Sequence, residues 1–218
     1  MEKKNIEIQD EINNLYFERF KNYSNNLGLS VPLIPRISEK YFENRTVIIG
    51  QETNTWYRNG NHDGLKNIFL ANQDNIEKVC LNDRYDKFIK NSVSKYSGKF
   101  WVFIKLLYEE QIIKNEFIEN NNLSHLWLNL FLVEACKDKN DKNGRPTSNS
   151  KLAEQVNNLQ GNLIREILNI LKPKLIISMT GYKLDYILLN NVLSNKSIIK
   201  SVDSKKILNK EMLGEIII

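Results

Sequence analysis

The chain has 218 residues, of which 41% are hydrophobic and 26% charged, so it is long enough to bury a core of its own and has an ordinary globular composition. All apolar runs are shorter than the roughly 18 residues of a membrane-spanning helix, and the N-terminus begins an amphipathic pattern instead of an apolar signal core. We therefore expect a cytoplasmic protein that does not enter membranes. The net charge of +5 is mild, so the distribution of basic residues is more informative than their total.

The first part of the chain predicts helices that lead into a buried strand. Apolar side chains recur at helical spacing between residues 6 and 26, and Gly28 is a suitable stop for that helix. The prolines of Val31–Pro35 predict an extended connector, since proline disfavours helix at the residue before it. A short helix over 38–44 then precedes Thr46-Val-Ile-Ile-Gly50, a β-branched run typical of a buried parallel strand that ends at Gly50 in a polar loop.

The rest of the chain alternates between helical patterns and apolar runs. Residues 65–118 predict mainly helix, most clearly over 100–113, and Leu123–Val133 predicts a second central strand. The amphipathic pattern over 151–171 predicts one helix, which Pro173 closes. The remaining expected elements are a strand at 175–179, a helix at 180–193 and two strand-like runs at 198–202 and 212–218.

Strands separated by helices predict a parallel sheet that is covered on both faces. The sequence contains no internal repeat and no linker typical of a domain boundary. We therefore expect a single α/β domain over residues 1–218, folded as a three-layer α/β/α sandwich, with residues 1–30 as an N-terminal helical extension. Nothing in the sequence indicates the oligomeric state.

Two polar residues near the ends of expected strands are candidates for chemistry. Asn129 interrupts an apolar run, and burying an amide without partners costs a few kcal/mol. Its side chain either bonds a neighbouring loop or helix end, or presents a donor and an acceptor to the edge of a pyrimidine or amide ring. Glu52 follows Gly50, and its carboxylate either caps a following helix or orients a water and stabilises developing positive charge. Trp56 and Tyr57 either cover the core or stack on a base.

The sequence indicates neither a metal nor a cofactor. Cys80 and Cys136 lie next to apolar residues and outside any metal-binding spacing, so we expect buried free thiols. His62 and His125 are too few and too far apart to predict zinc. We therefore expect chemistry without a cofactor.

Basic residues are concentrated in two segments. Residues 137–145 contain four basic and two acidic side chains, and residues 196–210 contain five lysines. Basic loops beside a site hold phosphates and make binding depend on salt, whereas the alternative is a pair of solvated loops. The possible contacts to a nucleic-acid backbone in the first segment are Lys137, Lys139, Lys142 and Arg145.

Two segments together resemble motifs of the uracil-DNA glycosylase superfamily. Gly50-Gln-Glu-Thr-Asn54 corresponds to a Gly-Gln-Asp-Pro-Tyr loop after the first strand, and other branches of the superfamily place a glutamate after the glycine. Leu128-Asn129-Leu130 corresponds to a Leu-Leu-Asn motif in a later central strand. The resemblance covers about residues 31–218 and implies a sandwich with a central, mainly parallel four-stranded sheet.

The resemblance implies hydrolysis of the N-glycosidic bond of a flipped-out uracil or other altered base in single- or double-stranded DNA. Glu52 would align a water and support the oxocarbenium-like sugar. The backbone of Gln51 would bond a base carbonyl, and Asn129 would read the pairing edge of the base. Asn54 is a further candidate for base contact, and stacking would come from Trp56, Tyr57 or Phe69.

The sequence departs from the superfamily pattern in two places. Thr53 and Asn54 replace a proline and a tyrosine, and because that tyrosine normally excludes thymine, the choice of base is open. The closing His-Pro-Ser motif does not occur in this sequence. The chain is then either a shortened form of a longer protein or a catalytically inactive member that binds nucleic acid or a nucleotide. A small-molecule hydrolase or transferase is the third hypothesis.

Overall fold

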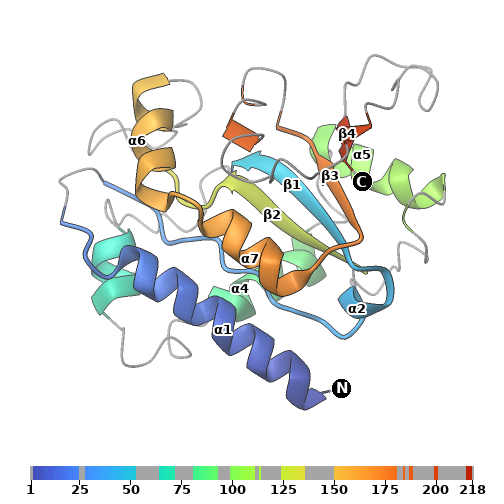
Figure 1. Cartoon of the computed structure of the whole chain (residues 1–218), viewed down its shortest axis with the longest axis horizontal. Helices are drawn as coiled ribbons and strands as arrows, with labels where there is room; N and C mark the ends of the chain where they lie inside the picture. Colours follow the sequence, from blue (N-terminus) through green and yellow to red (C-terminus); the bar gives the residue numbers. More distant parts are fainter. Residues whose placement is uncertain are drawn as a thin grey trace.

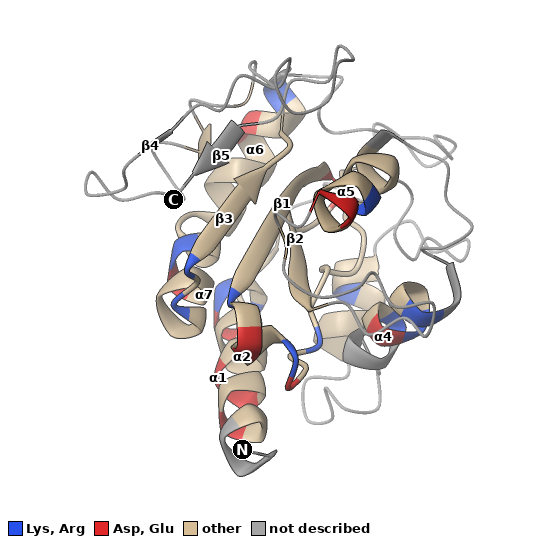
Figure 2. Cartoon of the chain, turned by 90° about the vertical axis from the view of Figure 1, so that its right-hand side faces the viewer, with Lys and Arg blue, Asp and Glu red and all other residues tan. Residues whose placement is uncertain are grey.

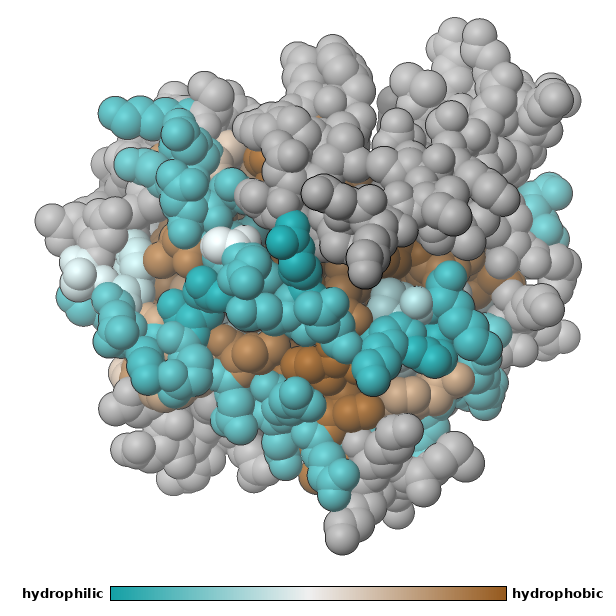
Figure 3. All heavy atoms as spheres, in the orientation of Figure 1, coloured by the Kyte–Doolittle hydropathy of each residue, from teal (hydrophilic) through white to brown (hydrophobic). Residues whose placement is uncertain are grey.

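The structure, a computed structural model, describes residues 2–24, 28–52, 64–71, 81–92, 99–110, 113, 124–135, 150–180, 184, 187–188, 199–200 and 215–217. At its centre lies a β-sheet with helices on both sides (Figure 1). On the face that carries α1 and α7, polar side chains cover much of the described surface and apolar side chains show between them (Figure 3). None of the described helices is long and apolar enough to cross a membrane.

Five described strands form one sheet in the order β2-β1-β3-β5-β4. β1 (Thr46–Glu52) is parallel to both of its neighbours, β2 (His125–Phe131) and β3 (Leu175–Ser178). β5 (Glu215–Ile217) is antiparallel to β3 and to β4 (Ile199–Lys200). The expected α/β class and the parallel centre are confirmed. The sheet has five strands where we expected four, because both short apolar runs late in the sequence join it beside β3.

Helices cover both faces of the parallel strands. α1, α6 and α7 lie on one face, and α4 and α5 lie on the other (Figure 2). Because β2 is enclosed from both sides, all of its residues are buried, as its nearly continuous apolar sequence predicts. The helices in chain order are α1 (Glu2–Phe20), α2 (Tyr41–Asn44), the π-helical η1 (Leu65–Phe69), α4 (Leu81–Ser92), α5 (Lys99–Glu109), α6 (Ser150–Gln160) and α7 (Leu163–Leu171).

The first helix packs into the core. Ile12, Tyr16 and Phe20 recur at helical spacing and are fully buried. The Tyr16 hydroxyl donates a hydrogen bond to the backbone oxygen of Leu33 at 2.7 Å, which ties α1 to the extended connector predicted from its prolines. Gln9 fixes the same connector further along, since its side-chain amide bonds the backbone of residues 35 and 37. α1 therefore holds the segment that leads into β1.

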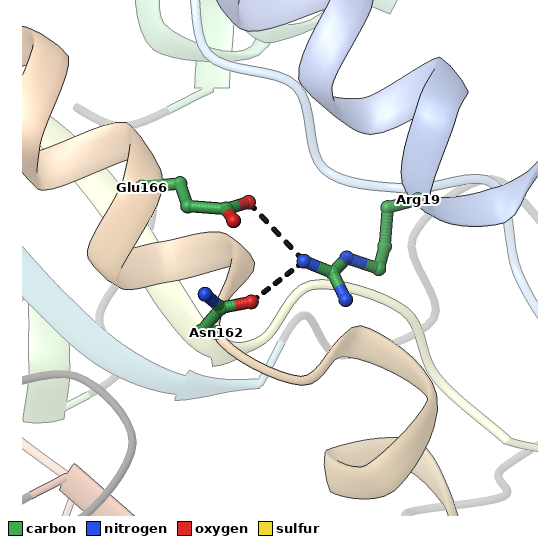
Figure 4. A network of polar contacts seen from close by, with 3 residues as sticks. All are labelled: Arg19, Asn162 and Glu166. Atoms are coloured by element: carbon green, nitrogen blue, oxygen red, sulfur yellow. Dashed lines mark hydrogen bonds and ion pairs between the residues drawn. The ribbon is translucent and has the colours of Figure 1, made fainter.

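The amphipathic pattern over 151–171 forms two helices, so the prediction of one helix is wrong. Gly161 adopts a φ of +53°, a left-handed conformation that glycine tolerates and that interrupts the helix. Arg19 of α1 lies at this break, where its Nη2 atom donates to Asn162 Oδ1 at 2.6 Å and to Glu166 Oε2 at 3.2 Å (Figure 4). The break thus gives α1 a polar contact at the start of α7.

The outer side of β2 has no neighbouring strand in the described sheet, so its peptide groups need other partners. Tyr85 of α4 supplies one set: its hydroxyl accepts from the Trp127 N–H at 2.8 Å and donates to the Trp127 carbonyl at 3.2 Å. Gln160 of α6 bonds the opposite side of the strand near the end of β1: its side-chain amide donates to the Leu130 carbonyl and accepts from the Leu132 N–H, and these residues alternate with Trp127 and so face β1. Tyr85 thus satisfies the outward peptide groups of Trp127, and Gln160 bonds the backbone of β2 beside the end of β1.

Candidate functional site

The structure describes three of the residues that the sequence assigned to the site: Gln51, Glu52 and Asn129. Phe69, one of the three stacking candidates, is buried and packs edge-on against Phe20 of α1 at 6.5 Å, as a core residue does. Three sets of predictions lie outside the described residues: the two thiols, the helix at 180–193 apart from four buried residues, and several site residues. Those site residues are Asn54, Trp56, Tyr57, Lys137, Lys139, Lys142 and Arg145.

β1 continues through Gln51 and Glu52, so the prediction that the strand ends at Gly50 is wrong. The pairing with β2 extends to this point: Gly50 lies opposite Asn129, and Glu52 lies opposite Phe131. Side chains alternate between the two faces of a sheet, so Glu52 and Asn129 point to the same face, while Gln51 points to the other. The register therefore places Glu52 and Asn129 on one face of the sheet, two positions apart on neighbouring strands and near their C-terminal ends.

Asn129 is 1% exposed, and the two halves of its amide have different surroundings. Its Oδ1 atom accepts a hydrogen bond from the Trp127 indole Nε1 at 3.0 Å. A Cβ atom at Gly50 would lie 2.5 Å from the same oxygen, so the amide needs a glycine beneath it. Among the described residues, the Nδ2 atom has no hydrogen-bond partner. Asn129 thus makes a structural bond with its acceptor while its donor stays unsatisfied, which costs about 1–3 kcal/mol.

Aromatic side chains from α4 and α5 surround this part of the sheet. Trp127 is the common neighbour, with ring-centre distances of 5.4 Å to Phe88, 6.1 Å to Phe100 and 5.2 Å to Trp101. Tyr85 stacks on it at 5.9 Å. Phe100 is half-buried and also reaches Gly50, since one of its ring carbons lies 3.0 Å from where a Cβ at position 50 would be. The Asn129 amide therefore lies beside an aromatic wall.

Sequence reasoning missed the residues of this wall, because aromatic side chains on an amphipathic helix have the pattern of a core. It also missed Ser178 and Thr180, whose buried hydroxyl groups are 3.0 Å apart at the end of β3. Ser178 lies opposite Ile49 and so faces away from Glu52. A polar residue that interrupts an apolar run is the signal that identified Asn129, and the same signal marks Ser178. Glu134, a buried acid shortly after β2, is a further example.

His125 lies at the other end of β2, opposite Thr46. It is four residues from Asn129, or roughly 13 Å along the strand. Its Nδ1 atom is 2.6 Å from the Tyr108 hydroxyl, and burial lowers the pKa of the imidazole to about 3. Burial also raises the pKa of Tyr108 to about 12, so both groups are uncharged at neutral pH. His125 is therefore a buried core residue remote from the candidate site.

The described part of the chain contains no group of three His, Cys, Asp or Glu side chains that is arranged to hold a metal ion. Its candidate site is instead formed by an acid, an amide and aromatic rings at the ends of β1 and β2. No protein-family model, curated protein or solved structure matches the chain.

Proposed function

We propose that the protein is a DNA glycosylase-like enzyme that hydrolyses the N-glycosidic bond of a flipped-out uracil or other altered base in DNA. The observation that supports this most is the pairing of Gly50 with Asn129, which leaves Glu52 and the Asn129 amide on one face of the sheet. Ligands of open α/β sheets bind just beyond the carboxyl ends of such strands. The net charge of +5 suits a polyanionic substrate.

Glu52 serves the sugar side of the reaction in this proposal. Its side chain is half-buried at the last position of β1, so its carboxylate is in partial contact with water. The oxygen of a water forms a bond to C1′ while the C1′–N bond breaks, and the electron pair of that bond leaves with the base. Glu52 accepts the proton of the attacking water and stabilises the positive charge that develops on the sugar.

Asn129 serves the base side. The unsatisfied Nδ2 donor would bond a carbonyl of the base and stabilise the negative charge that the departing base carries. Because Asn129 is 1% exposed, a base reaches it only after covering side chains move apart. Flipping the nucleotide costs a few kcal/mol, which base contacts in the site would offset.

A second candidate function is binding of nucleic acid or a nucleotide without catalysis. The bond between Asn129 Oδ1 and Trp127 favours it, because that bond occupies half of the amide for a structural purpose. A single remaining donor is enough to hold a carbonyl, whereas reading a whole base edge needs donor and acceptor together.

An assay of base release separates the two functions. The protein is incubated with single- and double-stranded oligonucleotides that carry uracil, hypoxanthine or another altered base, and alkali then cleaves any abasic site. Strand breaks at the altered base support the glycosylase. Affinity that falls steeply with salt, without breaks across the panel, supports the binding protein. If neither breaks nor binding is observed, both functions are wrong.

A further inference from the structure

We propose that Trp127 is a positioning residue that determines which bases the site accepts, because it holds the Asn129 amide with the acceptor inward and leaves the Nδ2 donor for the ligand. The site then prefers a base that presents a carbonyl oxygen at the contact, such as uracil or hypoxanthine, to one that presents an amino group there, such as cytosine or adenine. This inference rests on the function proposed above.

The orientation of the amide follows from the chemistry of the indole. Trp127 and Asn129 are two residues apart on β2, so their side chains project from the same face, and Nε1 lies 3.0 Å from Oδ1. An indole N–H can only donate. A flipped amide would turn Nδ2 toward it, and two donors would then face each other in a buried place. The Trp127 bond therefore selects one of the two amide orientations.

The indole itself is held in place by its neighbours. Trp127 is 5% exposed, with Tyr85 stacked on it at 5.9 Å and Trp101 packed edge-on at 5.2 Å. The Tyr85 hydroxyl also bonds both backbone groups of Trp127. Because helices α4 and α5 fix the indole, its N–H direction is set before any ligand binds.

The acceptor half of Asn129 is crowded on its other side as well. Gly50 lies directly against Oδ1, at a position where even a Cβ atom would be 2.5 Å away. This oxygen lies between the indole and the backbone of β1, whereas the Nδ2 atom has no hydrogen-bond partner in the part of the chain that the structure describes. A base carbonyl can accept from Nδ2, but a base amino group would meet it donor to donor.

The first experiment measures the amide orientation without any ligand. Trp127→Phe keeps an aromatic ring and removes the N–H. Tyr16→Phe is the matched control, since it also removes one donor from a buried aromatic side chain, and Tyr16 lies on α1 at the other face of the sheet. We expect the NMR signals of the Asn129 side-chain amide to shift or to split into two conformers in Trp127→Phe and to stay in place in Tyr16→Phe. An amide that Trp127→Phe leaves unchanged overturns the positioning role.

The second experiment measures base preference with oligonucleotides that carry 2′-fluoroarabino uridine or cytidine, which resist cleavage. We expect the wild type and Tyr16→Phe to prefer uracil by about 10-fold or more, and Trp127→Phe to lose most of that preference. If Trp127→Phe does not fold, Asn129→Asp tests the donor on which the inference depends, because it keeps an acceptor for the indole and lacks Nδ2. A uracil preference that survives in Asn129→Asp overturns the inference.

The outcomes distinguish this inference from the function on which it rests. A uracil preference that persists in Trp127→Phe overturns the role of Trp127 and leaves base binding in place. If the wild type binds neither oligonucleotide, the proposed function and the base preference are both wrong, and the amide signals alone then decide whether Trp127 orients Asn129.

Discussion

The side-chain oxygen of Asn129 lies against Gly50 so closely that a Cβ atom at position 50 would be 2.5 Å from it. Gly50 therefore provides space for a side chain of the neighbouring strand, which is one of the reasons for which glycine occurs within strands. Residues 50 and 129 are far apart in the sequence, yet their contact determines the geometry of the candidate site.

We expect Gly50→Ala to lower the free energy of unfolding by about 1–3 kcal/mol, because the added methyl group overpacks the site. In the Asn129→Ala background the same change should cost about 1 kcal/mol less, since the clashing oxygen is gone. Part of the cost remains there, because Phe100 also lies 3.0 Å from the new Cβ. Denaturant unfolding of the four proteins gives the coupling energy, and strictly additive effects would contradict the contact.

Glu52→Gln should reduce base release by about 100-fold or more and leave oligonucleotide binding nearly unchanged, since the amide cannot accept the proton of the attacking water. Glu39→Gln is the matched control, because Glu39 is an exposed acid before β1 and far from its C-terminal end. The rate of base release under single-turnover conditions checks the prediction. Equal rates for Glu52→Gln and the wild type would remove Glu52 from the mechanism.

His125 should make the fold less stable in acid. Its pKa is about 3 in the folded protein, against an ordinary value of 6.5, so below pH 6.5 the unfolded chain takes up a proton that the folded chain does not. The free energy of unfolding should therefore fall as the pH decreases from 6.5 toward 3, by at most about 1.4 kcal/mol per pH unit from this group.

Between pH 7 and 5.5 most carboxyl groups stay ionised, so the change in unfolding free energy over this range reports the titration of His125 with little contribution from them. His125→Gln keeps a hydrogen-bonding group beside Tyr108 and cannot titrate, so its unfolding free energy should depend less on pH over that range. Urea unfolding at several pH values measures both slopes. Identical slopes in the two proteins would mean that His125 takes up its proton equally in the folded and unfolded states, which would contradict the lowered pKa.

Gly161→Ala should lower the free energy of unfolding by about 1–2 kcal/mol, because a residue with a Cβ is strained at a φ of +53°. Lys172, after α7, is the opposite case: it already has a side chain at a φ of +47°, so Lys172→Gly should cost nothing or stabilise by up to about 1 kcal/mol. Thermal unfolding of both variants checks the difference in sign. Destabilisation of the same size at both positions would argue against backbone strain as the cause.

The strands could be predicted because each is a short apolar run with a polar boundary. The break between α6 and α7 could not, because Leu159 and Leu163 on either side of Gly161 keep the helical spacing of apolar residues. Only the backbone angle of Gly161 distinguishes two helices from one. Arg19 of α1, which lies beside this break, is distant in the sequence, so the spacing of apolar residues does not reveal the contact.

The site could be predicted in part for a similar reason. Asn129 was identifiable as an amide within an apolar strand, but its partner Trp127 was not, since a tryptophan in an apolar run has the pattern of a core residue. The role of Gly50 was misjudged: glycine after a β-branched run indicates a strand end, whereas here it allows close approach of Asn129. Both errors concern pairs of residues, and a single sequence does not contain the register that pairs them.

The capping of the outer side of β2 by Tyr85 has a consequence for the behaviour of the protein in solution. Uncovered, the uncharged run Leu-Trp-Leu-Asn-Leu-Phe would offer its peptide groups to other chains, and such segments form intermolecular sheets readily. The strand that carries Asn129 is thus also a strong hazard for self-association, and the Tyr85 hydroxyl stands where another molecule would otherwise pair. Loss of this hydroxyl would therefore tend to appear first as aggregation during expression and storage.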